Sequence, residues 1–195
     1  MEDNPLRKLE NESFVFAGHT LKSLFEELVG RNFREFLKLS DAEIIEYLAG
    51  LLTQFSQAEN LYAIRNARGK PIEDVAEMLL VSNPLLEAPS FDREREVRKH
   101  IGDFTLFFTG IFPEAINRWR LRRQHLDSLI DYVKAGKESY FIVSKFNVFE
   151  YKDSAPFFRK MSDQFETCVF GLNLVKQDLE RMQQAAYVRA QELLS

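Results

Sequence analysis

The sequence predicts an all-α fold, a compact bundle of six or seven helices with a long C-terminal helix. Apolar residues recur every three or four positions along most of the 195-residue chain, which is the period of an amphipathic helix. The six prolines and eight glycines are scattered between these segments and form no linker. Apolar residues make up 45% of the chain and charged residues 29%, as in ordinary globular proteins. We therefore expect residues 1–195 to form a single α-helical domain.

The first two helices are predicted from their end signals. Residues 21–29 suit a helix that is closed by Gly30. A second helix is expected to begin where Ser40 and Glu43 have the spacing of a capping box, and to run to about residue 57. The apolar side chains of this second helix fall on one face, which favours a surface helix that packs on a core. They are Ile44, Leu48, Leu51, Leu52 and Phe55.

Two further helices are predicted on either side of a proline-containing loop. Pro71 lacks an amide hydrogen and suits a first helical turn, so we expect a helix over residues 71–81. The next helix should cover residues 92–112, with Asp92 as its N-cap and Pro113 as its stop. Its second half is apolar on nearly all sides, and we therefore expect it to lie at the centre of the bundle.

The last third of the chain ends in the strongest helical signal. Helices are expected over residues 126–133 and 139–149, and in the second we favour helix over strand despite its β-branched and aromatic residues. From near residue 153 the chain continues towards residue 194 with an apolar stripe at heptad spacing. So long a helix spans the bundle or projects towards a partner. The stripe proposed for helix packing or for a dimer interface is Phe165, Cys168, Leu172, Val175, Leu179 and Met182.

The charge and the cysteine content of the chain limit the classes of binding partner and the cellular compartment that we expect. The net charge is -4 with mixed signs along the chain, so we expect neither nucleic acid nor a membrane as a partner. The apolar run 104–112 is also too short to span a bilayer. Cys168 is the only cysteine, which excludes an internal disulfide and favours a reducing compartment. The first residues do not read as a secretory signal, and we expect a cytoplasmic protein.

One segment carries a family resemblance. Residues 102–114 contain Gly102, Asp103, Leu106, Phe107, Gly110 and, at the end, Phe112, Pro113 and Glu114. This Gly-Asp-x-x-Leu-Phe-x-x-Gly-x-Phe-Pro-Glu pattern resembles a stretch of uncharacterised bacterial helical proteins. The resemblance implies no activity, and the small residues of the segment are explained by close helix packing.

His100 and Asp103 lie one helical turn apart and form the metal-ligand alternative. Imidazole and carboxylate groups ligate metals in helical bundles. A di-iron site, however, needs Glu-x-x-His pairs, and none of the three histidines belongs to one. We therefore favour a structural role in which Asp103 is neutralised by a nearby arginine or by His100. We predict no metal and no cofactor.

An arginine-rich segment is the candidate anion site. Trp119 lies among four arginines, and guanidinium groups bind phosphate or carboxylate through paired hydrogen bonds. On a helix these side chains point in several directions, so a solvated face paired with acids is the favoured alternative. The four residues are Arg118, Arg120, Arg122 and Arg123.

The sequence offers no catalytic motif, and function stays open between two classes. Cys168 sits in the apolar stripe, which favours a core thiol over a nucleophile. We expect a non-catalytic interaction or scaffold protein, most simply a homodimer that uses the heptad stripe, or a protein with another protein partner. The alternative is a bundle that binds an apolar small molecule, a cofactor or a metal in an interior lined by Phe104, Phe107 and Phe108.

Overall fold

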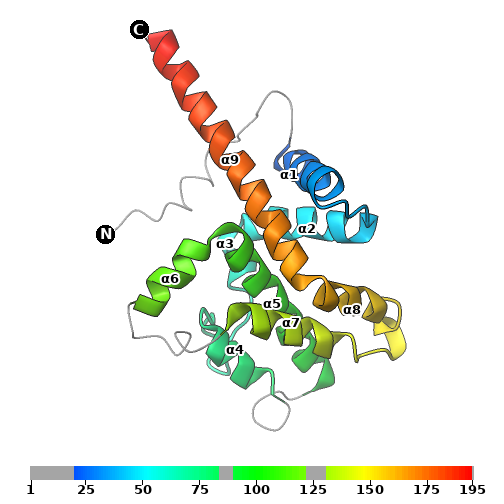
Figure 1. Cartoon of the computed structure of the whole chain (residues 1–195). Helices are drawn as coiled ribbons and strands as arrows, with labels where there is room; N and C mark the ends of the chain where they lie inside the picture. Colours follow the sequence, from blue (N-terminus) through cyan, green and yellow to red (C-terminus); the bar gives the residue numbers. More distant parts are fainter. Residues whose placement is uncertain (1–19, 84–89, 122–130, 195) are drawn as a thin grey trace.

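The computed structural model describes residues 20–83, 90–121 and 131–194, with the side chains of 118–121 and 185–194 excepted. Within these residues the fold is built of helices and contains no β-strand. The predicted all-α class and the long C-terminal helix are therefore confirmed (Figure 1). The described helices are α1 (Leu21–Arg31), α2 (Ala42–Phe55), α3 (Ala58–Leu61), α4 (Val75–Val81), α5 (Phe91–Ile111), α6 (Pro113–Leu121), α7 (Tyr132–Val143), α8 (Ala155–Asp163) and α9 (Phe165–Leu194).

The described ranges hold nine α-helices, more than the six or seven expected. Helices α3 and α6 were not predicted, because each is short and carries little apolar periodicity. The expected continuous C-terminal helix is divided at Gln164, which separates α8 from α9. The break places Phe165 in the core, where its ring lies against Gly136 of α7. The helix expected over residues 126–133 falls largely outside the described residues.

Several predicted helix ends are wrong, and the wrong starts arise because other side chains cap the free backbone amides. Helix α1 continues through the buried Gly30 to Arg31 and passes into a π-helical turn, Asn32–Phe36. Helix α2 is capped by Asp41 and not by Ser40, since the Asp41 carboxylate accepts hydrogen bonds from the amides of Glu43 and Ile44. A carboxylate at this position also interacts favourably with the helix dipole.

The later helices also begin at residues other than those predicted, because other side chains cap their free backbone amides. Helix α4 begins at Val75 behind an Asp74 cap, and Pro71 lies before it in an isolated antiparallel bridge with Arg65. Helix α5 is capped by the Ser90 hydroxyl, which leaves the predicted cap Asp92 inside the first turn. Helix α7 begins at residue 132, not 139, because Asp131 caps it. Residues 140–143 are helical and not a strand, as predicted, but the helix ends at Val143 and not at residue 149.

Helix α5 lies at the centre and makes its most extensive contacts with α7 and α9. Ile101, Phe104 and Leu106 are fully buried in its second half, which confirms the expected central position. Buried apolar side chains from most of the described helices form one continuous core around it. The extension of a single domain over residues 1–195 stays a prediction.

The heptad stripe of α9 is used within the chain over most of its length. Phe165, Cys168, Leu172 and Val175 are fully buried, whereas Leu179 and Met182 are partly buried against the core. Beyond this point α9 extends past the other helices (Figure 1). The apolar stripe is therefore mainly a packing surface of the bundle. Searched over its described residues, the structure contains no helix with the length and apolar character needed to cross a membrane.

Candidate functional site

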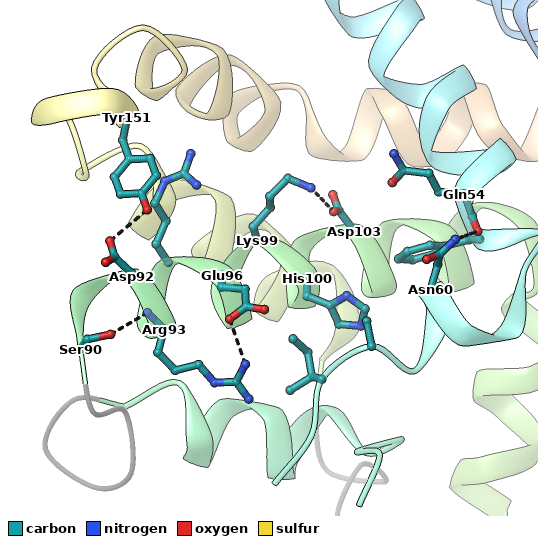
Figure 2. Close-up of a pocket in the computed structure, with 14 residues that line it drawn as sticks. Gln54, Asn60, Ser90, Asp92, Arg93, Glu96, Lys99, His100, Asp103 and Tyr151 are labelled. Carbon is teal, nitrogen blue, oxygen red and sulfur yellow. Dashed lines mark hydrogen bonds and ion pairs between the residues drawn. The ribbon is translucent and has the colours of Figure 1, made fainter. Parts of the chain in front are cut away.

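A polar cleft of about 650 Å³ runs along the first half of α5. Helix α5 forms one wall, the end of α2 and the segment around α3 form the other, and Tyr151 closes one end (Figure 2). The α5 side chains fall on one face because their positions repeat at intervals of three and four. These side chains are Asp92, Arg93, Arg95, Glu96, Lys99, His100 and Asp103.

The buried carboxylate of Asp103 forms the floor of the cleft at its inner end. The hydroxyl groups of Tyr47 and Tyr140 each donate a 2.6 Å hydrogen bond to Asp103 Oδ1. Lys99 Nζ lies 2.7 Å from Asp103 Oδ2 and is the third side chain that contacts this carboxylate. The side chain of Asp103 is only 6% exposed, and a buried carboxylate requires such partners. Helices α2, α5 and α7 therefore meet at one carboxylate.

Burial and charge keep both tyrosines of this cluster protonated. The pKa of Tyr140 is raised well above its ordinary value, first by burial and then by the negative charge of Asp103. The same two causes raise the pKa of Tyr47. Each hydroxyl therefore serves as a hydrogen-bond donor to the carboxylate and is poorly suited to act as a base or a nucleophile.

His100 is held beside this cluster in its neutral form. Its Nε2 lies 3.1 Å from the carbonyl oxygen of Leu61, so a protonated Nε2 donates to that oxygen. The imidazole packs against the ring of Phe55, with ring centroids 5.7 Å apart. Burial lowers the pKa of His100, and this effect exceeds the opposing attraction of Asp103.

Arg95 is fixed at the opposite end of the cleft. Its guanidinium carbon lies 3.9 Å from the centre of the Tyr151 ring, within the range of a cation–π interaction. Its Nη2 donates a 2.9 Å hydrogen bond to the Ser154 hydroxyl. Its Nε is buried and has no hydrogen-bond partner among the described residues. Tyr151 is held in turn by a 2.9 Å hydrogen bond to Asp92.

Positive and negative side chains alternate between these two ends. Arg93 pairs with Glu96 at 2.9 Å and also donates to the carbonyl oxygen of Arg65. Three acidic and three basic side chains of α5 thus line the cleft, in addition to the neutral His100. The wall therefore carries no net charge and presents both signs within a few helical turns.

His100 and Asp103, the metal-ligand alternative of the sequence, both line this cleft, but each is engaged with other groups. Asp103 accepts from two tyrosines and Lys99, and His100 contacts a backbone carbonyl. Within the described ranges, no three histidine, cysteine or acidic side chains are grouped as a metal site. The neutralising partner of Asp103 is Lys99, where we expected an arginine or His100.

The three predicted pocket phenylalanines lie in the core on the same helix. Phe104 is fully buried, and Phe107 and Phe108 are 7% and 6% exposed. Their rings pack on one another, with centroids 4.6 Å apart for Phe104 and Phe108 and 5.5 Å apart for Phe107 and Phe108. None of the three lines the polar cleft.

The predicted arginine cluster is divided by the limits of the described residues. The backbone of Arg118 and Arg120 belongs to α6, and their side chains are outside the described set. Arg122 and Arg123 lie wholly outside the described residues. The anion site at these four positions stays a prediction.

Sequence reasoning missed Lys99 and Arg95, which line the cleft. It also missed Tyr47 and Tyr140, which hold the carboxylate of Asp103. Lys99 and Asp103 have the i, i+4 spacing of a helical ion pair, which was an available signal. The tyrosines come from helices separated by 56 and 37 residues from Asp103. Their convergence depends on tertiary packing, which local patterns do not report.

Comparison with known proteins yields no relatives for this chain: no family model matches it, and neither the curated proteins nor the solved structures contain a match. The resemblance of residues 102–114 to bacterial helical proteins stays a prediction.

Proposed function

We propose that this chain is a non-catalytic binding protein whose polar cleft receives a small molecule with both an acidic and a basic group, such as an amino acid or a short peptide. One observation carries the proposal: the cleft wall on α5 offers three cations and three carboxylates on one helical face. A ligand with both signs of charge can pair with such a wall without leaving an unpaired buried charge.

The size of the cleft supports a small ligand. Sites for small molecules and cofactors commonly have volumes of roughly 300–1,000 Å³, and this cleft has about 650 Å³. Its inner end is fixed by Asp103 and its outer end by Arg95 stacked on Tyr151. Fixed side chains lose little conformational freedom when a ligand arrives, which favours binding.

Unused hydrogen-bonding capacity supports the same proposal. Lys99 has three ammonium donors and directs one at Asp103. Gln54, on the facing wall, uses only its backbone in hydrogen bonds, and its side-chain amide has no partner among the described residues. A ligand carboxylate could accept from Lys99 and Arg95, while its amine donates to Glu96.

The chemical state of the cluster favours binding over catalysis. Both tyrosines have raised pKa values, and each oxygen of Asp103 already accepts a hydrogen bond. The thiol of Cys168 is buried in the core, away from the cleft lining. These groups are suited to hold a fixed geometry and not to exchange protons with a substrate.

A thermal-shift panel tests the proposal with glutamate, lysine, glycylglycine, succinate and putrescine as probes. The zwitterionic probes should raise the unfolding temperature, and succinate and putrescine should do so less. Glu96→Gln should raise the Kd of the tightest-binding zwitterion by about tenfold or more, since a charge-assisted contact is worth about 1.5–3 kcal/mol.

Glu138→Gln is the matched control for that variant. Glu138 and Glu96 have side chains that are 61% and 62% exposed, and each pairs with a cation on its own helix. The control should bind the probes as the unmodified chain does. Absence of any shift with the zwitterions, or equal weakening by both variants, would contradict the proposed ligand.

A second candidate function is protein interaction through α9, with a second copy of the chain as the partner. It is favoured by the extension of this 30-residue helix beyond the bundle (Figure 1). Phe170, on the outer side of α9, is 57% exposed and offers an apolar anchor. A cytoplasmic location is part of this proposal, because a lone cysteine suits a reducing compartment.

Native mass spectrometry tests the second candidate by measuring the mass of the assembly. A homodimer has about twice the 22.8 kDa mass of the chain. Phe170→Glu should dissociate it while leaving the fold intact, whereas charges at Leu179 or Met182 should also destabilise the chain, since both residues pack against its core. A monomer at every protein concentration would exclude the homodimer.

A further inference from the structure

A second cavity, of about 520 Å³, lies between the end of α7 and the start of α8. Three of the residues that line it are cationic, Lys145, Lys152 and Arg159, and none is acidic. The polar cleft on α5 balances its charges, and the whole chain has a net charge of -4. The second cavity is therefore a local concentration of positive charge on an acidic protein.

Among the described residues, two of its three cations have no acidic partner. Arg159 Nε pairs with Asp163 at 3.0 Å. Lys145 Nζ lies 4.3 Å from the centre of the Phe141 ring, which is a cation–π contact and leaves ammonium hydrogens available. In the described part of the chain, neither Lys145 nor Lys152 has a carboxylate within ion-pair distance. Their charges are thus free to bind an anion.

The start of α8 adds to the positive potential of the cavity. Ala155 and Pro156, the first residues of this nine-residue helix, line it directly. The preceding Ser154 makes no capping hydrogen bond, because its hydroxyl donates to the Tyr151 carbonyl and accepts from Arg95. The positive end of the helix dipole therefore supplements the three cations.

An exposed apolar turn lies, along the chain, between two of the residues that line the cavity. Val148 is 53% exposed and Phe149 is 88% exposed, between the lining residues Asn147 and Lys152. Phe149 has a φ of 49°, a left-handed conformation that is costly for an aromatic residue. The chain thus holds a large apolar side chain in solvent against its conformational preference. Residues held in such conformations cluster at active sites, ligand clamps and switch regions.

We propose that this cavity binds a phosphate-type anion carried by a molecule with an apolar part, which rests on Phe149. Lys145, Lys152 and Arg159 contact the anion, and the exposed turn contacts the apolar part. A soluble organic phosphate and the headgroup of an anionic lipid share this chemistry. The site is separate from the polar cleft and does not depend on the function proposed for it.

Backbone-amide NMR titrations with inorganic phosphate and phenyl phosphate, and co-sedimentation with vesicles, test this site. Phenyl phosphate should bind more tightly than inorganic phosphate, with shifts at residues 144–159 that weaken as salt rises. The double variant Lys145→Met/Lys152→Met should bind phenyl phosphate about tenfold or more weakly. Phe149→Gly should remove the preference for phenyl phosphate over inorganic phosphate.

A second double variant, Lys70→Met/Lys134→Met, removes the same charge from exposed positions outside the cavity and should bind normally. Vesicles of phosphatidylcholine with phosphatidic acid identify the lipid source if they sediment the protein and phenyl phosphate does not bind. Binding of phenyl phosphate alone identifies a soluble ligand. Failure of both, or equal loss in the two double variants, overturns the proposal.

Discussion

The hydroxyl of Tyr140 lies 2.6 Å from Oδ1 of Asp103, inside the contact between α5 and α7. The same oxygen accepts from Tyr47 of α2, also at 2.6 Å, and the other oxygen contacts Lys99. One buried carboxylate therefore joins three helices and forms the floor of the polar cleft. This arrangement links the stability of the bundle to the shape of the proposed binding site.

Replacement of Tyr140 by phenylalanine should destabilise the chain by about 1.5–3 kcal/mol, because a hydrogen bond to a buried charge is lost. Tyr47→Phe should have a similar effect, since it removes the other donor to the same oxygen. Equilibrium unfolding in urea measures both changes. Tyr62→Phe is the control, because Tyr62 is partly buried without a hydroxyl partner in the described residues, and it should change stability by less than about 0.5 kcal/mol.

Gly102→Ala should destabilise the chain by about 1–3 kcal/mol through overpacking. A Cβ at this position would lie 2.4 Å from Cε1 of Tyr140, and that ring is held by its hydrogen bond to Asp103. Gly50→Ala is the matched control within α2, where a Cβ meets no atom within 4 Å. It should stabilise the helix by about 0.5–1 kcal/mol. Equal effects of the two substitutions in urea unfolding would show that α5 and α7 are not this close.

Stability should fall as the pH drops below about 6.5, the ordinary pKa of histidine. Burial lowers the pKa of His100 in the folded chain, so the unfolded chain takes up this proton first. The stability due to the neutral imidazole is thus complete above that pH and is lost at up to about 1.4 kcal/mol per pH unit below it.

His100→Gln keeps a donor for the Leu61 carbonyl and removes the titrating group. Its unfolding free energy should be nearly independent of pH between 7 and 5.5, in which range the carboxylates Asp41 and Asp178, with lowered pKa values, stay ionised. Identical pH profiles for the variant and the unmodified chain would assign the dependence to another group.

Cys168 should resist thiol reagents in the folded protein. Its side chain is fully buried, and burial raises the pKa of the thiol to about 12. At pH 8 a maleimide should therefore label it only as fast as the chain opens, and completely in concentrated urea. Rapid labelling without denaturant would contradict the burial of Cys168 on the core-facing side of α9.

The helical class was predictable because apolar periodicity is local, and the central burial of α5 followed from its apolar second half. The helix starts were not predictable, because neighbouring polar side chains can cap the same free backbone amides. The residues that cap these helices in the structure are Asp41, Asp74 and Ser90. Of the residues in the cleft, His100 and Asp103 could be identified from the sequence, because they lie one helical turn apart. The donors to Asp103 come from other helices, and no local pattern in the sequence reports that convergence.

The most direct test of the proposed cleft is a backbone-amide NMR titration of the whole chain with each of the common amino acids. Saturable shifts at residues 92–103 of α5 and around Asn60 on the facing wall, reduced in Glu96→Gln but not in Glu138→Gln, are the predicted result. Shifts confined to other surfaces, or no saturable shift with any amino acid, would contradict the claim that this cleft binds a small zwitterion.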